Sequence, residues 1–224
     1  MSEYVVHEEE YKGLTIKILP DYDPGMNPVE DYDMLGKQVY WHRRMNLGHC
    51  WKETNKYSPE EWLESKLEDG IYDTWLEMDE PKPEFMQFLW EKFEENNLVI
   101  PVHAYEHGGI TISASGKRAG WDSFDSGQLG FVYVSHADII KEFGSLDLEL
   151  AEKRLIAEVK EYDSYLTGEI YGYRIEDENE EELDSCWGFL GDYEYCLEEA
   201  RGSADYWAEQ KEKELNLYDK RMTE

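Results

Sequence analysis

The stretch LVIPVHAYEHGGITISAS, residues 98–115, decides the fold class. Two runs rich in β-branched and aromatic residues flank His107, Gly108 and Gly109, and glycine readily takes the positive φ that a tight turn requires. This pattern predicts an antiparallel hairpin. Just beyond it, residues 128–134 (QLGFVYV) predict another strand, and S-H-A-D from Ser135 is a helix-capping pattern.

Strands and helices also mix along the rest of the chain. Alternation of apolar residues predicts an edge-type strand at 14–19 and further strands at 38–42, 169–176 and 185–190. Capping patterns and helical spacing predict helices after Ser58 and at 83–97, 146–166 and 193–217. Because no regular βαβ order appears, we expect an α+β fold in a single domain, residues 1–224. Its mainly antiparallel sheet would have about five to seven strands, with helices packed on it.

The composition sets limits on function. The 224 residues include 22 Lys and Arg against 52 Asp and Glu, which gives a formal charge of -30, and a hydrophobic fraction of 41% is ample for a core. Duplex DNA, RNA and anionic membranes each need a cationic footprint, so we expect no direct nucleic-acid binding and no membrane binding. No apolar run approaches about 20 residues, and the acidic start MSEYVVHEEE differs from a basic signal peptide. We therefore expect a cytoplasmic protein.

The acidic residues recur in short clusters, and these clusters are the main candidate for function. Carboxylates held several ångströms apart on a rigid scaffold imitate the phosphates of nucleic acid. The expected partner is a basic, nucleic-acid-binding protein, with fast and salt-dependent association. The residues predicted to bind it are Asp31, Asp33, Glu77, Asp79, Glu80, Glu176, Asp177, Glu178, Glu180, Glu181, Glu182 and Asp184.

A second hypothesis is a small hydrolase or nucleotide-modifying enzyme built around the segment WDSFDSGQ, residues 121–128. Asp122 and Asp125 would form a carboxylate pair and Ser126 a nucleophile, with Gln128 and His103 nearby. No G-x-S-x-G elbow is present, because Phe124 stands two residues before Ser126. Asp and Ser also hydrogen-bond their own backbone in turns, so a purely structural loop is the alternative.

Metal and thiol chemistry have little support in the sequence. His103 and His107 are four apart in a predicted strand and turn, which would separate them by about 13 Å. The run at 176–184 fails as a calcium loop, because it lacks the required Gly and Gly188 stands where the last ligand should be. Three cysteines (Cys50, Cys186 and Cys196) give neither a disulfide framework nor a zinc knuckle. We predict no metal and no cofactor.

Three segments carry a resemblance to a known family: IPVHAYEHGGITIS (100–113), WDSFDSGQLGFVYV (121–134) and EIYGYRIEDENEEELDSCWGFLGD (169–192). They resemble a family of bacteriophage and mobile-element proteins with a W-D-S-G-Q-x-G-F-like core and a later D-S-C-W-G-F. In this chain the core motif is split into W-D-S and D-S-G-Q, as though part of it were duplicated. The family has no assigned activity, so no catalytic residue is transferred.

The resemblance implies a phage or plasmid gene expressed inside a bacterium. Acidic proteins of such elements are often similar in role to anti-restriction or anti-CRISPR inhibitors, which occlude the nucleic-acid site of a nuclease. We therefore predict a non-catalytic acidic interaction protein of this type, in which a nucleic-acid-mimicking surface inhibits a host defence nuclease. The enzyme at 121–128 and a phage structural or accessory role remain open alternatives.

Overall fold

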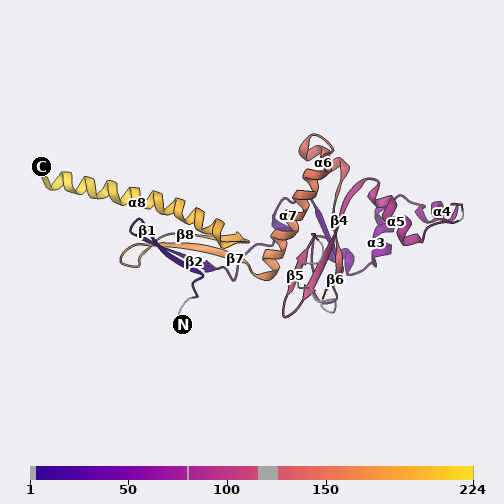
Figure 1. Ribbon diagram of the computed structural model, residues 1–224, viewed down its shortest axis with the longest axis horizontal. Helices are drawn as coiled ribbons and strands as arrows, with labels where there is room; N and C mark the ends of the chain where they lie inside the picture. The colour runs from indigo at the N-terminus through magenta and orange to yellow at the C-terminus, as the bar shows by residue number, and fades with distance from the viewer. Residues whose placement is uncertain (1–3, 80, 116–125, 224) are drawn as a thin grey trace. The chain divides into compact units, whose positions relative to one another are not determined.

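The computed structural model describes residues 4–79, 81–115 and 126–223, with side chains as far as residue 214. The chain forms two compact units, one from Met1–Met26 with Ser164–Glu224 and the other from Asn27–Asp163. Each unit has its own antiparallel sheet of four strands, and helices pack on both sheets (Figure 1).

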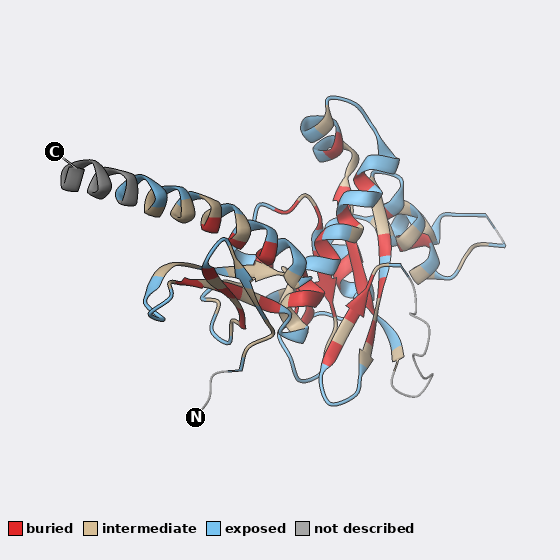
Figure 2. Ribbon diagram, turned by 60° about the vertical axis from the view of Figure 1, so that its left-hand side comes forward, coloured by how far each residue is buried: buried red, intermediate tan, exposed pale blue. Residues whose placement is uncertain are grey.

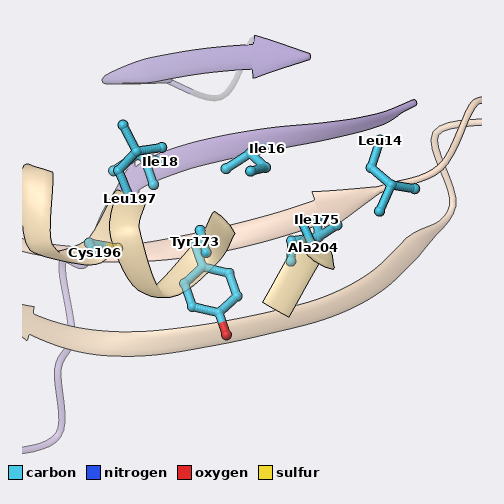
Figure 3. Close-up of a cluster of buried hydrophobic side chains, with 9 residues drawn as sticks. Leu14, Ile16, Ile18, Tyr173, Ile175, Cys196, Leu197 and Ala204 are labelled. Atoms are coloured by element: carbon cyan, nitrogen blue, oxygen red, sulfur yellow. The ribbon is translucent and has the colours of Figure 1, made fainter. Parts of the chain in front are cut away.

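The first unit pairs strands from the two ends of the chain. The sheet order is β1 (His7–Tyr11), β2 (Leu14–Pro20), β7 (Ile170–Glu176) and β8 (Glu182–Leu190). The long helix α8 (Tyr193–Thr223) covers one face. Figure 3 shows how apolar side chains from alternate positions of β2 and β7 meet this helix. The core residues are Leu14, Ile16, Ile18, Tyr173, Ile175, Cys196, Leu197, Ala200 and Ala204.

Strand β1 was not predicted from the sequence, because HEEEY carries three glutamates and no aliphatic residue. It lies at the edge of the sheet and pairs with β2, and charged side chains are tolerated on edge strands. Its Glu8 and Glu10 are exposed, while Glu9 is half-buried and bonded to Arg201 of α8. The prediction that residues 14–19 form an edge strand was wrong, since β1 and β7 flank β2 on its two sides.

The second unit holds the predicted antiparallel hairpin, formed by β4 and β5. The sheet order is β3 (Lys37–Tyr40), β6 (Ser126–Ser135), β4 (Asn97–Glu106) and β5 (Ile110–Ser113). The helices are α1 (Pro28–Asp31), α2 (Trp51–Thr54), α3 (Pro59–Lys66), α4 (Ile71–Leu76), α5 (Phe85–Glu94), α6 (His136–Phe143) and α7 (Leu148–Thr167). Ser58 and Ser135 cap α3 and α6 as expected.

Residues 129–132 of β6 are all buried, so both faces of this sheet are covered; Figure 2 marks the buried residues in red. On one face, Trp62 of α3 is completely buried among aromatic rings of α5 and β6, including Phe93 and Phe131. Helix α7 also contributes a buried polar group to the core of this unit. The carboxylate of Glu158 accepts hydrogen bonds from the backbone N–H groups of Leu35 and Gly36, both at 2.9 Å. These bonds satisfy a carboxylate that has almost no exposed surface.

The predicted α+β class with antiparallel strands is confirmed. The strands, however, form two sheets of four and not one sheet of about five to seven. Strand periodicity identifies the strands but not which of them pair, and here the chain makes the second sheet before it returns from β2 to β7. No helix within the described residues is long and apolar enough to cross a bilayer.

Candidate functional site

The face of the first sheet opposite α8 gathers carboxylates in two cross-strand rows. Strand pairing aligns Glu10, Thr15, Glu176 and Glu182 in one row. The adjacent row aligns Glu8, Lys17, Arg174 and Ser185. Directly paired residues share a face, and this face is opposite the core because Leu14, Ile16 and Ile18 point to α8. We call these two rows, together with the turn at 177–181, the acidic face.

Two cations at the centre of the acidic face hold part of it together. Lys17 Nζ lies 2.5 Å from a carboxylate oxygen of Glu176, which is 6% exposed. Arg174 lies 3.2 Å from Glu182 and 3.7 Å from Glu176. The hydrogen bond to Glu176 is the largest cause that raises the pKa of Lys17, with smaller contributions from Glu8 and Glu180. Glu176 is therefore a buried structural group and not a contact for a partner.

The β7–β8 turn presents further carboxylates on a well-defined backbone. Asp177 accepts hydrogen bonds from the backbone N–H groups of Glu181 and Asn179, which lower its pKa. Backbone bonds between Asp177 and Glu181 and between Glu180 and Asp177 close the turn. The side chains of Glu178, Glu180 and Glu181 are exposed, and none has an ion-pair partner within the described residues. The backbone of the tip is thus fixed, and its three exposed glutamates form no ion pair within the described residues.

An exposed aromatic residue adjoins the same face. The ring of Trp187 on β8 covers Gly172 of β7, where a Cβ would overlap it. Gly172 pairs with Leu19, which follows Lys17 at a spacing of two and therefore shares its face. Trp187 is 44% exposed although it is large and apolar. Exposed tryptophans near charged residues are typical anchors of protein interfaces.

The remaining predicted acidic residues have separate positions. Asp184 accepts a hydrogen bond from Ser203 of α8, which places it on the core side of the sheet. In the second unit, Asp31 accepts a hydrogen bond from the backbone N–H of Asn27 at 2.6 Å. Asp33, Glu77 and Asp79 are exposed at the ends of α1 and α4. Glu80 lies outside the described residues.

The segment behind the enzyme hypothesis is only partly described. Asp122 and Asp125 lie outside the described residues. Ser126 and Gln128 line a pocket of about 730 Å³ in the second unit, and the Ser126 hydroxyl has no hydrogen-bond partner among the residues that the structure describes. His103 pairs with Gln128 in the sheet, but it is not among the residues that line this pocket.

The sequence reasoning missed the basic part of this pocket. His42, Arg43 and Arg44 line it together with Glu106, and none of them was predicted as a site. A signal was present, because His42–Arg43–Arg44 is the only run of three basic residues in a strongly acidic sequence. No group of three His, Cys, Asp or Glu side chains in the described chain is arranged to hold a metal ion.

No protein-family model matches the chain, and no curated protein or solved structure is significantly similar to it. The resemblance to phage proteins therefore stays a prediction.

Proposed function

We propose that this chain is a non-catalytic interaction protein of a phage or mobile element whose acidic face binds a basic, nucleic-acid-binding site on a host protein. One observation carries the proposal. The β7–β8 turn holds three exposed carboxylates that form no ion pair in the described chain, and strand β8, which follows the turn, carries an exposed tryptophan.

The electrostatics support a cationic partner. The acidic face contains Glu8, Glu10, Glu176, Asp177, Glu178, Glu180, Glu181 and Glu182 against the cations Lys17 and Arg174. Both cations are already used in ion pairs within the face. An incoming Arg or Lys would therefore meet carboxylates that have given up little of their charge, and charge-assisted hydrogen bonds to them are comparatively strong.

The arrangement also supports specificity beyond general charge. A solvated acidic tail would attract any cation, but here the strand register and the Asp177 turn fix the carboxylates relative to Trp187. A rigid aromatic residue supplies contact area at a low cost in conformational entropy. We expect the partner to pack an apolar or aromatic group on Trp187 and basic side chains on the hairpin tip.

The test is capture of proteins from bacterial lysate on the immobilised chain, followed by Kd measurements with the purified partner at low and high salt. We expect a basic protein that elutes with salt and that duplex DNA displaces. The triple variant Glu178→Gln/Glu180→Gln/Glu181→Gln should bind it at least tenfold more weakly, with a flatter salt dependence. Trp187→Ala should weaken binding at all salt concentrations.

The matched control is Glu60→Gln/Glu64→Gln/Glu68→Gln, which makes the same charge change on exposed positions of the second unit. It should alter the Kd by less than about threefold, because long-range charge effects are screened. Equal losses in the two triple variants would leave general charge as the only attraction and would overturn the proposal. A captured partner that DNA does not displace would overturn the nucleic-acid mimicry.

A further inference from the structure

The pocket in the second unit opens where two strands stop pairing. Strands β3 and β6 pair as far as Tyr40 and Gly130, and the Trp41 N–H donates a last hydrogen bond to Leu129 O at 3.0 Å. Beyond this point residues 41–44 form one wall, and the other lining residues come from β4 and the start of β6. The volume of about 730 Å³ is in the range of small-molecule sites.

Hydrogen bonds fix the basic segment on this wall. His42 Nδ1 accepts bonds from the backbone N–H groups of Arg44 at 3.3 Å and Met45 at 3.0 Å. Its proton therefore resides on Nε2, which lies 3.2 Å from Glu106 Oε1 and donates to it. The His42 side chain is only 6% exposed. The imidazole is thus a fixed link between the turn and Glu106.

Glu106 also orients the second cation of the segment. Its other carboxylate oxygen accepts a hydrogen bond from the Arg44 guanidinium at 2.9 Å. Burial alone would raise the pKa of Glu106, but the bonds from His42 and Arg44 outweigh it and lower that pKa. Glu106 is therefore ionised near neutral pH, and it holds Arg44 at the pocket while the Arg44 side chain stays 80% exposed.

Several polar groups of the pocket remain available to a ligand. Arg43 is exposed and has no ion-pair partner in the described chain, although acids outnumber bases by more than two to one. Most of the N–H groups of Arg44 are also unused, since only one of its nitrogens bonds to Glu106. Ser126 also lines the pocket, and its buried hydroxyl has no hydrogen-bond partner among the described residues. Trp41, Ala104 and Leu129 supply apolar surface.

We infer that this pocket binds a small organic phosphate of about the size of a mononucleotide, with the phosphate on Arg43 and Arg44. Guanidinium groups bind phosphate oxygens through paired, charge-assisted hydrogen bonds. A phosphate in the pocket would give Arg43 a charged partner, which it lacks in the described chain, and would also use the N–H groups of Arg44 that do not bond to Glu106. The organic part would lie on the apolar wall. The indole N–H of Trp41 donates to Tyr57 O at 2.9 Å and so fixes the ring of that wall.

The test measures Kd by calorimetry for the four ribonucleoside 5′-monophosphates, their nucleosides and inorganic phosphate. We expect at least one mononucleotide to bind at least tenfold more tightly than both its nucleoside and inorganic phosphate. Arg43→Gln should weaken that binding at least tenfold, and Arg43→Lys should recover only part of the loss because it lacks the planar fork. Lys56→Gln, an exposed cation outside the pocket, is the matched control and should have no effect.

Other results would overturn the inference. One is that no mononucleotide binds at millimolar concentration. Another is that a nucleotide binds no more tightly than its nucleoside or than inorganic phosphate. A third is an unchanged Kd in Arg43→Gln. Arg43 makes no contact that folding requires in the described chain, so this variant should fold normally. The inference is independent of the proposed function. Arg43→Gln should not change binding of a basic partner, and the triple glutamate variant should not change nucleotide binding.

Discussion

The bond between Glu9 and Arg201 holds the edge strand β1 to helix α8. Two of the three guanidinium nitrogens of Arg201, Nε and Nη2, donate to the Glu9 carboxylate at 2.7 Å. The hydrogen bond from Arg201 is the largest cause that lowers the pKa of Glu9 from 4.5 to about 2; burial opposes it, and His7, 3.2 Å from the carboxylate, supplies a smaller part of the lowering. At about 1.4 kcal/mol per pKa unit, the full difference would correspond to about 3 kcal/mol.

Screening by solvent reduces this value, because the Glu9 side chain is 20% exposed and that of Arg201 is 42% exposed. We expect Glu9→Gln to destabilise the first unit by about 1–2 kcal/mol at pH 7. The pKa of Glu9 is lower in the folded than in the unfolded chain. The stabilisation is therefore fully present above pH 4.5 and disappears as the pH falls toward about 2.

The assay is hydrogen exchange of β1 peptides in the wild type and the variant, compared at the same pH. Protection of β1 should fall by about tenfold or somewhat more in Glu9→Gln at pH 7, and the difference should shrink below pH 4.5. Arg201→Gln should act in the same direction, and the double variant should be no worse than the more damaging single one. Neutralising the exposed Glu209, which lies 3.6 Å from Lys213 on α8, is the control and should change nothing. Equal protection in wild type and Glu9→Gln would refute the reasoning.

Two further predictions concern the second unit. In Gly130→Ala the new Cβ would overlap the Val39 carbonyl oxygen of β3. We therefore expect the free energy of unfolding, measured by urea denaturation, to fall by about 2–3 kcal/mol. Gly127→Ala on the same strand meets no atom within 4 Å and should be nearly neutral; equal effects would contradict this account. Burial is the main cause that lowers the pKa of His49 from 6.5 to about 4, and its Nδ1 accepts the Gln38 N–H at 3.0 Å. Neutral His49 therefore stabilises the fold above pH 6.5, and this contribution is lost as the pH falls toward 4; an NMR titration midpoint near 6.5 would refute it.

Local patterns predicted most of the elements because their causes are local. The Ser58 and Ser135 caps each involve residues three apart, and the His107–Gly109 turn needs only its own glycines. Strand β1 was missed because its stability comes from distant partners. It pairs with β2, and Glu9 reaches Arg201, which is 192 residues away in the chain. No local signal distinguishes three glutamates in a strand from three glutamates in a loop.

In the candidate sites, too, the sequence predicted what depends on neighbouring residues and missed what depends on distant ones. The sequence identified the acidic hairpin tip, since Glu178, Glu180 and Glu181 are neighbours in the chain. It did not reveal that Glu176 is buried against Lys17, or that Asp184 bonds to Ser203, because those contacts depend on sheet register and on α8. The pocket combines residues from before β4, from β4 and from β6, so its composition emerges only when the strands pair.

In a chain with 22 basic and 52 acidic side chains, the position of a cation is a better indicator of a binding site than the position of an acid. Where Arg154 and Arg201 meet Glu158 and Glu9, the cation supports a carboxylate that the fold buries in whole or in part. Arg43 supports none in the described chain, yet it lies at a concave surface beside Arg44. A cation without a structural use, kept in a pocket while acids are abundant, favours an anionic ligand. By the same reasoning, free carboxylates on the fixed turn of β7–β8 favour a cationic one, so the two units would bind ligands of opposite charge.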